Sequence, residues 1–389
     1  MAEAQRDYDL LVFGATGFTG GMTAEYLARN APATLRWAIA GRSQAKLDAV
    51  KVRLTKLNER CRDLPTVQAG LDDADSLQRM AAKTRVLVTT VGPFIDYGEP
   101  VVRACVEQGT DYIDSTGEPH FMSLLLGRYS AAASARGVRL VPSCGFDSIP
   151  ADIGALFTVL QLPPNQPIDL AGYLSLDAKF SGGTERSAIL SWVPPAEKID
   201  VPPRKPSNGR RVGAGPAKVQ RRPELQRWSS PLPTIDGPLV LRSAMGLDRY
   251  GPDFKYSHNA VHPSLFVLIA AAIFFGTVAF MAKFPPLRAI LLKGAKQSGE
   301  GPSPEVMAKS WFKLHFIAQC AGKTLQTEVS GGDPGYVETS KMLAEAGMCL
   351  AQDREVLPPR AGVLTPAEAM GPRLLARLQN AGLKFRVVQ

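Results

Sequence analysis

Cysteine and histidine are scarce in this chain, and their spacing argues against two kinds of site. None of the five cysteines belongs to a C-x-x-C pair: Cys61, Cys105, Cys144, Cys320 and Cys349. An odd number at wide spacing argues against a disulfide framework and a structural zinc site, and favours a reducing compartment. The four histidines have no metal-ligand spacing either: His120, His258, His262 and His315. We therefore expect no bound metal.

Aromatic residues are also few, at 7% of the chain, and acidic residues are outnumbered. Lys and Arg total 45 against 36 Asp and Glu, a net charge of +9. This surplus suits an anionic partner, such as a phosphorylated cofactor, a phosphopantetheine carrier or an anionic membrane. Few aromatics stand among the basic residues, so nucleic acid is not an expected partner. The acidic N-terminus does not resemble a signal peptide, which favours the cytoplasm.

The first 160 residues alternate between short apolar runs and helical patterns. The runs are typical of strands buried on both faces, at residues 10–13, 37–40, 66–68, 85–90, 112–114 and 139–142. Helical patterns separate them, at residues 19–30, 44–60, 74–83, 100–108 and 121–136. Six strands joined by five crossovers predict an α/β fold with a Rossmann-type, doubly wound parallel sheet.

The strongest motif is GATGFTG, which follows the first strand and opens a helix. Gly14 permits a tight turn, Gly17 lets the backbone approach a pyrophosphate, and Gly20 lets helix and strand pack closely. The N–H groups and the dipole of the helix N-terminus both favour anions. We therefore predict a dinucleotide site formed by Gly14, Ala15, Thr16, Gly17, Phe18, Thr19 and Gly20.

The end of the second strand predicts which dinucleotide binds. NAD sites usually place Asp or Glu there, to bind the ribose 2′-hydroxyl. This chain places Arg42 and Ser43 there, with Lys46 one turn later. Arg42 can bind a 2′-phosphate through two N–H groups, Ser43 can donate to it, and Lys46 adds charge. The pattern predicts NADP(H), and a cap of a surface turn is the alternative role for Arg42.

Two further segments are expected beside the cofactor. The fourth strand ends in TTVGPF, and ligands of this fold bind at the carboxyl ends of strands. We expect the nicotinamide ribose to be flanked by Val91, Gly92, Pro93 and Phe94. Asp72 follows the third strand and either contacts the adenine end or caps the next helix.

The middle of the chain, residues 161–262, is rich in Pro, Gly and Ser. Within it, Glu224 is the sole acid among eight cations: Arg204, Lys205, Arg210, Arg211, Lys218, Arg221, Arg222 and Arg227. Two interpretations stay open, a solvated loop and an electrostatic contact with a membrane or a carrier protein.

An uncharged apolar run, LFVLIAAAIFFGTVAFMA, spans residues 265–282. Its length is at the lower limit for a bilayer span. Three interpretations stay open: a buried core helix, an in-plane or hairpin membrane anchor, and a true span. Gly276 and the prolines at 285 and 286 favour a bent or docked segment. A basic cluster that suits a lipid surface follows it: Lys283, Arg288, Lys293 and Lys296.

The tail from about residue 333 reads as helix. Thr365, Pro366 and Glu368 form the pattern of a capping box with proline at the first helical position. The expected apolar face of that helix consists of Leu374, Leu375, Leu378 and Leu383.

Several motifs together resemble those of the saccharopine dehydrogenase-like oxidoreductases. GATGFTG, AGRS, TTVGPF, DYIDSTGE and CGFDSIPAD occur in the order found in that family, and SGGT, GDPGY, ETSKMLAEAG and GVLTPAEAMG extend the match. The resemblance is strongest to the trans-acting enoyl reductase branch. It implies an NADP-binding domain at 1–160, an inserted α+β domain facing substrate or membrane at 161–330, and a segment at 331–389 that returns to the first domain.

The resemblance also implies a function. It implies an NADPH-dependent reductase of lipid or polyketide-type acyl chains in lipid or glycolipid biosynthesis, with the substrate held as an acyl thioester on a carrier protein. It further implies contact with the cytoplasmic membrane or lipid droplets through residues 265–282, and a homodimer is compatible with it. One alternative is an imine or amino-acid oxidoreductase, which needs arginines to hold dicarboxylates. The other is a non-catalytic, NADP-bound scaffold on lipid surfaces.

Reduction of an enoyl group needs a hydride, a donor for the enolate oxygen and a proton for the α-carbon. Tyr97, just past the GPF turn, is the first candidate donor. Asp147 is the second, in the segment after the sixth strand that also holds Cys144 and Ser148. Structural roles are the alternatives: Asp147 as a helix cap and Cys144 as a small apolar filler.

Overall fold

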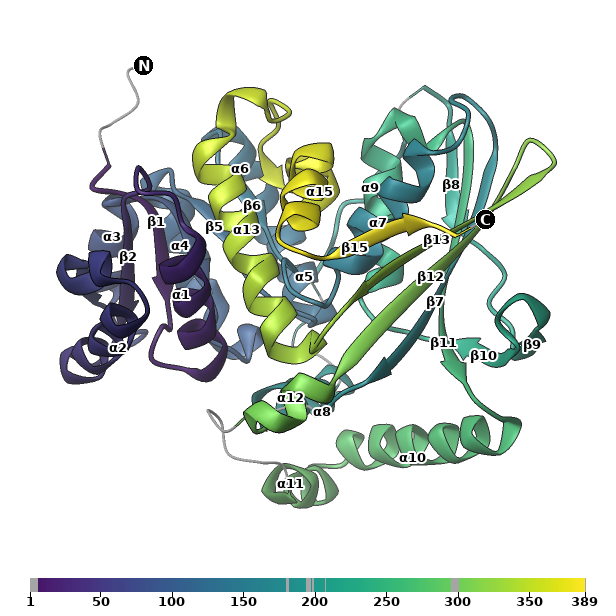
Figure 1. Ribbon diagram of the computed structural model, residues 1–389, viewed down its shortest axis with the longest axis horizontal. Helices are drawn as coiled ribbons and strands as arrows, with labels where there is room; N and C mark the ends of the chain where they lie inside the picture. Colours follow the sequence, from purple (N-terminus) through teal and green to yellow (C-terminus); the bar gives the residue numbers. More distant parts are fainter. Residues whose placement is uncertain are drawn as a thin grey trace. The chain divides into compact units, whose positions relative to one another are not determined.

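The computed structural model describes residues 6–179, 182–193, 197, 199–206, 208–294 and 301–388 (Figure 1). Ser181 of the SGGT motif and Lys296 of the basic cluster lie outside the described residues. The chain forms two compact units. The first comprises Met1–Phe146, Ile199–Val201 and Tyr336–Ala381, and the second comprises Asp147–Lys198, Pro202–Gly335 and Gly382–Gln389.

A seven-stranded parallel sheet forms the centre of the first unit, in the order β14-β6-β5-β4-β1-β2-β3. The strands are β1 (Tyr8–Phe13), β2 (Trp37–Gly41), β3 (Thr66–Gln68), β4 (Thr84–Thr89), β5 (Asp111–Ile113), β6 (Arg139–Val141) and β14 (Gly362–Val363). The predicted Rossmann-type sheet is confirmed. Its seventh strand was not predicted, because a two-residue strand has no periodicity to recognise.

Helices flank this sheet: α1 (Phe18–Asn30), α2 (Gln44–Leu57), α3 (Ala74–Ala82), α4 (Phe94–Gln108), α5 (Pro119–Leu124), α6 (Ser130–Ala135), α13 (Thr339–Gln352), α14 (Pro366–Ala369) and α15 (Gly371–Asn380). Two predicted helices differ from the observed ones. The helix predicted from residue 100 starts at Phe94 and contains Pro100. The helix predicted over 121–136 is interrupted by a π-helical turn, Leu125–Tyr129.

The C-terminal helices complete the first unit. α13 packs against α1, β1 and β4. Gly347 allows this close approach, because a Cβ atom there would lie 2.8 Å from Leu10 Cδ1. The capping box of Thr365 and Glu368 is present, as the sequence predicts. Leu383 is a correction: it lies past the end of α15, just before strand β15.

An eight-stranded sheet forms the second unit, in the order β15-β13-β12-β7-β11-β10-β9, with β8 also paired to β11. Its strands are β7 (Ile168–Asp177), β8 (Arg211–Ala214), β9 (Gln220–Arg222), β10 (Arg227–Pro231), β11 (Asp253–His262), β12 (Trp311–Cys320), β13 (Lys323–Gly331) and β15 (Lys384–Val387). The helices of this unit are α7 (Ile149–Leu160), α8 (Gly182–Ser191), α9 (Asp236–Gly246), α10 (Leu265–Lys283), α11 (Pro285–Gly294) and α12 (Pro304–Lys309). α7 packs on β12 and β13, and α9 packs on β11.

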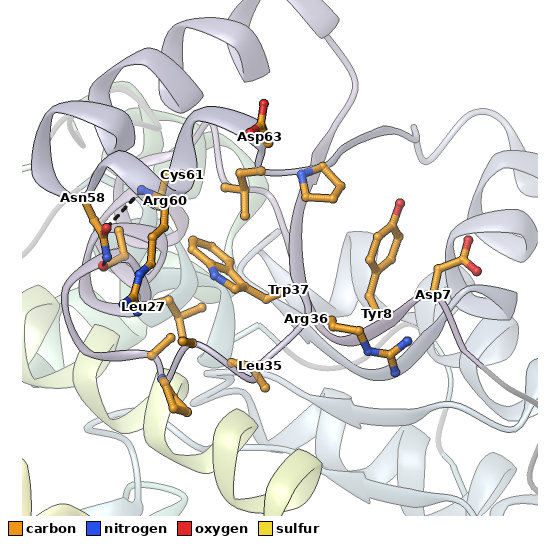
Figure 2. A pocket seen from close by; sticks show the side chains of 16 residues that line it. Asp7, Tyr8, Leu27, Leu35, Arg36, Trp37, Asn58, Arg60, Cys61 and Asp63 are labelled. Atoms are coloured by element: carbon orange, nitrogen blue, oxygen red, sulfur yellow. Dashed lines mark hydrogen bonds between the residues drawn. The ribbon is translucent and has the colours of Figure 1, made fainter.

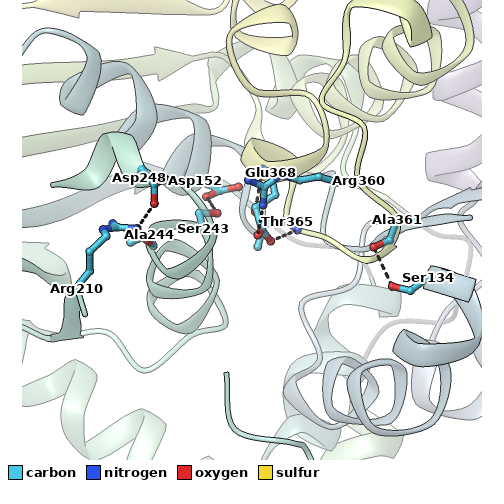
Figure 3. Close-up of polar contacts among 10 residues, drawn as sticks. All are labelled: Ser134, Asp152, Arg210, Ser243, Ala244, Asp248, Arg360, Ala361, Thr365 and Glu368. Atoms are coloured by element: carbon cyan, nitrogen blue, oxygen red, sulfur yellow. Dashed lines mark hydrogen bonds and ion pairs between the residues drawn. The ribbon is translucent and has the colours of Figure 1, made fainter. Parts of the chain in front are cut away.

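Three strands of this sheet, β8, β9 and β10, begin within the cationic segment at 204–227. Arg210 has a side chain that is only 7% exposed. It donates to the carbonyl of Ala244 and pairs with Asp248 (Figure 3). It also donates to the carbonyl of Gly251. The guanidinium of Arg222 lies 5.0 Å from the ring centroid of Tyr173. The solvated-loop interpretation is therefore wrong at these arginines, while an electrostatic contact with a partner stays a prediction.

Helix α10 is exposed along most of its length, beside α11 (Figure 1). Only 11% of its apolar window is buried, and the Phe266 side chain is 80% exposed. The core-helix interpretation of residues 265–282 is therefore wrong. Among the described residues, α10 alone is long and apolar enough to cross a membrane. Length and composition do not distinguish an anchor from a span, and both stay predictions.

Candidate functional site

The GATGFTG loop has a shape that glycine alone allows. Gly14 has φ +90°, and a Cβ atom there would lie 2.8 Å from Val91 Cγ2. A Cβ atom on Gly20 would lie 2.2 Å from the carbonyl oxygen of Gly14. Gly17 N donates to that same oxygen at 2.9 Å, which closes the turn. The backbone of β1 and the first turn of α1 therefore approach each other as closely as a dinucleotide loop requires.

The N-terminus of α1 is open to an anion. Its N-cap is Gly17, which has no side chain to accept from the first N–H groups, and the first turn holds no acid. Phe18 packs edge-to-face on Tyr336 of the GDPGY motif, with centroids 4.9 Å apart. Ser340 Oγ of α13 donates to Thr19 O at 3.3 Å. The C-terminal segment thus holds this loop in place and leaves its N–H groups for a phosphate.

Arg42 and Ser43 lie between β2 and α2. Ser43 is the N-cap of α2, and its Oγ accepts from Lys46 N at 3.4 Å. The hydroxyl proton of Ser43 can still be donated to a phosphate. Arg42 is exposed, and no hydrogen bond or ion pair to another described residue engages its guanidinium. Ser43, and not Arg42, is therefore the N-cap of α2.

Asp72 is not the N-cap residue of α3. The cap is its neighbour Asp73, whose carboxylate accepts from Ser76 N at 2.9 Å. Asp72 itself is exposed in the turn after β3. The helix-cap alternative for Asp72 is therefore wrong, and its contact with the adenine end stays a prediction.

The VGPF turn after β4 is fixed by a residue that the sequence analysis did not single out. Glu118, only 4% exposed, accepts from Phe94 N at 2.9 Å and from Ile95 N at 2.8 Å. This carboxylate therefore satisfies the first N–H groups of α4. Val91 N donates to Thr89 Oγ1 at 3.3 Å, which orders the other end of the turn.

The DYIDSTGE motif, which contains Glu118, also contains the buried Asp114. Asp114 accepts from Tyr112 Oη at 2.8 Å, from Thr116 N at 2.8 Å and from Ser143 N at 2.9 Å. Burial raises the pKa of the Asp114 carboxyl to about 6, although these hydrogen bonds oppose the shift. The motif ties the ends of β5 and β6 to the start of α4. Its high density of polar residues was the signal in the sequence.

The candidate acids fall in different units. Tyr97 lies in the first turn of α4 in the first unit, and its side chain is 43% exposed. Asp147 begins the second unit and is half-buried. It is not the cap of α7, because the N-cap is Ser148, which makes no side-chain cap hydrogen bond. The Cys144 side chain is buried, as the filler alternative requires.

A cavity of about 350 Å³ lies elsewhere in the first unit (Figure 2). Tyr8, Trp37 and Pro65 line it, at the amino ends of β1, β2 and β3. Ligands of open α/β sheets bind at the carboxyl ends of the strands. The glycine loop and Arg42 are at that carboxyl edge, so this cavity is not the cofactor site.

Comparison with known proteins agrees with this geometry. Residues 10–141 match the family described as the saccharopine dehydrogenase NADP binding domain. The trans-acting enoyl reductase of Mycobacterium tuberculosis is 33% identical over an alignment that covers 98% of each chain. The mouse saccharopine dehydrogenase-like oxidoreductase is 32% identical over 100% of this chain and 99% of its own. The chain belongs to the saccharopine dehydrogenase-like oxidoreductase family.

Two further relatives extend the comparison of this saccharopine dehydrogenase-like protein. A second M. tuberculosis protein, provisionally named a trans-acting enoyl reductase, is 35% identical over 100% of this chain and 99% of its own. Saccharopine dehydrogenase (L-Glu forming) of Saccharomyces cerevisiae has the same fold, with a TM-score of 0.58 at 14% identity over 98% and 99% of the two chains. The protein is thus an NADP-dependent oxidoreductase, and its glycine loop and Arg42 suit that cofactor.

Replacing Arg42 with alanine is expected to remove the preference for NADPH over NADH. Charge-assisted hydrogen bonds contribute about 1.5–3 kcal/mol, so the Kd for NADPH should rise roughly 10- to 100-fold while that for NADH changes little. Fluorescence titration with both cofactors measures this. Arg62→Ala, at an arginine 68% exposed and paired with Glu59, is the control. An equal loss for both cofactors would remove Arg42 from the 2′-phosphate.

Proposed function

We propose that this oxidoreductase is a trans-acting enoyl reductase, which reduces a carbon–carbon double bond in a lipid or polyketide-type acyl thioester. The observation that carries the proposal is the end-to-end match to proteins of that name, over 98–100% of this chain. A match of this extent includes the second unit as well as the NADP-binding domain.

The residues of the first unit suit the binding part of this reaction. NADPH supplies a hydride from C4 of its nicotinamide, which reduces the β-carbon. The glycine loop and the open N-terminus of α1 bind the pyrophosphate, and Arg42, Ser43 and Lys46 bind the 2′-phosphate. Asp72 is assigned to the adenine end of the cofactor. The VGPF turn, braced by Glu118, is assigned to the nicotinamide ribose, and Tyr97 is assigned as the donor to the enolate oxygen.

A lipid surface is the proposed source of the substrate. α10 exposes aromatic side chains, among them Phe266, Phe274 and Phe280, and Lys283, Arg288 and Lys293 follow near its end. A helix of this kind, with cations behind it, suits an in-plane anchor on an anionic cytoplasmic membrane or lipid droplet. The net charge of +9 also suits an acyl carrier protein. A homodimer is compatible with these contacts.

NADPH oxidation with a panel of enoyl thioesters of rising chain length tests the proposal. Turnover should grow with chain length, because each added methylene buried at the site contributes about 0.8 kcal/mol to binding. The reduced acyl product is identified by mass spectrometry. Saturated thioesters of the same lengths are the control and should give no oxidation. Turnover of small imines but of no enoyl thioester would favour the imine reductase. NADPH binding without any turnover would favour the scaffold.

A further inference from the structure

The eight-stranded sheet of the second unit has two unlike faces. Helices α7 and α9 pack on one of them, where Thr158 of α7 and Thr327 of β13 are hydrogen-bonded at 2.6 Å. The even-numbered residues of β12 are all buried on that side of the sheet. The odd-numbered residues point to the opposite side, and Trp311, Lys313 and Gln319 among them are exposed. We call this second side the outer face.

A row of polar side chains crosses the outer face. Arg386 of β15, Glu328 of β13 and His315 of β12 lie opposite one another in successive strands, and Tyr173 of β7 continues the row. Arg386 Nη2 donates to Glu328 at 2.6 Å, and His315 Nδ1 lies 3.4 Å from the same carboxylate. The guanidinium of Arg222 lies over the ring of Tyr173. These contacts fix the directions of both arginine side chains.

Cations outnumber acids on the outer face. Two ion pairs balance Arg211 with Asp253 and Arg386 with Glu328. Lys313 and Lys384 are exposed on either side of Ser330. The other charged strand residues of this face also have no ion pair with a described residue: the acids Asp169 and Asp177, and the cations Arg222, Arg227 and Lys255. This surplus makes a local positive potential that attracts an anionic partner.

The charge pattern distinguishes the partners that could cover the outer face. A second copy of the chain would bring the same cations together in a two-fold contact, where like charges repel. A lipid surface needs clustered apolar side chains, whereas Trp311, 39% exposed, stands beside the charged Lys313. An acidic protein surface suits both features, since its carboxylates meet the cations and Trp311 is an aromatic anchor of the kind that interfaces favour.

We propose that the outer face of this sheet is the docking surface for an acidic acyl carrier protein, which delivers the enoyl thioester. The inference rests on the proposed reductase, because that function has its substrate carried on a separate protein. Lys313, Lys384 and Arg222 attract the carrier, and Trp311 packs against it. Docking raises the effective concentration of the thioester at the enzyme. It therefore lowers the KM for a carried substrate and leaves the chemical step unchanged.

Reversing the charge of two exposed lysines tests this surface. In Lys313→Glu with Lys384→Glu, attraction for an acidic partner becomes repulsion. The probe is a purified bacterial acyl carrier protein of net negative charge, loaded with phosphopantetheine. Its Kd, measured by fluorescence anisotropy at low ionic strength, should rise about 10-fold or more. The KM for an enoyl chain on this carrier should rise similarly. The KM for the same chain on free pantetheine, and kcat for both substrates, should not change.

A matched control keeps the net charge equal. Lys56→Glu with Arg60→Glu makes the same change in charge at exposed positions of the first unit, and it should bind the carrier as wild type does. The Kd for NADPH and the melting temperature should stay the same in both double variants. An equal loss of carrier binding in the control would assign the attraction to the net charge of the protein and overturn the docking surface.

Salt and a third variant separate the charged contacts from the apolar one. The Kd of wild type for the carrier should rise with salt, because exposed charges are screened. Trp311→Ala should weaken binding at low and high salt alike. If light scattering shows that wild type is a dimer and that Trp311→Ala is a monomer, the outer face belongs to a second copy and the carrier proposal is overturned.

The binding measurement needs no turnover, so it separates the docking surface from the reductase. Turnover of free enoyl thioesters by wild type, with an unchanged carrier Kd in Lys313→Glu with Lys384→Glu, would overturn the docking surface and leave the reductase intact. Carrier binding that this variant loses, without turnover of any enoyl thioester by wild type, would overturn the reductase and support the docking surface.

Discussion

Gly20→Ala is expected to abolish measurable NADPH binding, a loss of at least about 1,000-fold. The new Cβ would lie 2.2 Å from Gly14 O and 2.6 Å from Thr90 Oγ1, and the first of these is backbone that cannot rotate away. Either α1 moves away from β1 or the glycine loop changes shape. Both movements displace the N–H groups that bind the pyrophosphate, where charge-assisted hydrogen bonds are directional. Isothermal titration with NADPH measures the loss.

Two alanine variants calibrate this result. In Gly17→Ala the Cβ would lie 3.3 Å from Gly14 O, a tight contact that should cost less affinity. In Gly276→Ala, in the exposed helix α10, nothing lies within 4 Å and binding should not change. Circular dichroism confirms that each variant is folded. Full NADPH affinity in a folded Gly20→Ala protein would show that the cofactor does not bind at this loop.

Six of the seven strands in the first unit were predictable because each of the six is a short apolar run between helical patterns. The conformation of the glycine loop was also predictable, because it depends on local steric limits that the spacing of the glycines reveals. The start of α4 was not predictable in this way. Glu118, which satisfies its first N–H groups, follows it by 24 positions in the chain. Local patterns around Phe94 and Pro100 carry no information about so distant a partner.

The second unit shows the same limit more strongly. The segment at 204–227 read as a possible solvated loop, yet it contains β8, β9 and the start of β10. Arg210 is buried there by carbonyls that a sequence pattern does not place beside it. His258 read as an isolated histidine, since its partners Tyr256 and Asp236 meet it only across a strand face and a helix start. The alternation of Tyr256 and His258 along one strand was the available signal.

In helix α10, the double variant Phe274→Asp, Phe275→Asp should lose binding to anionic vesicles about 100-fold or more. These side chains are 63% and 59% exposed, so the change leaves the core of the second unit intact. Burying a phenylalanine contributes about 1.5–3 kcal/mol, and both contributions are lost when aspartate replaces it. Flotation with vesicles of phosphatidylglycerol and phosphatidylcholine measures the bound fraction. Vesicles of phosphatidylcholine alone should bind wild type more weakly, because they lack the negative surface charge that attracts Lys283, Arg288 and Lys293.

A lipid surface is a better occupant for α10 than a protein partner for a geometric reason. A helix that docks on protein usually has one apolar stripe, whereas exposed apolar residues of α10 include Phe266, Ile273, Phe275 and Phe280 on more than one face. Val52→Asp with Val356→Asp, at apolar side chains 59% and 71% exposed in the first unit, is the matched control and should still float. Wild type that stays in solution as a dimer, and becomes monomeric in the Phe274 and Phe275 variant, would instead assign α10 to a second copy of the chain.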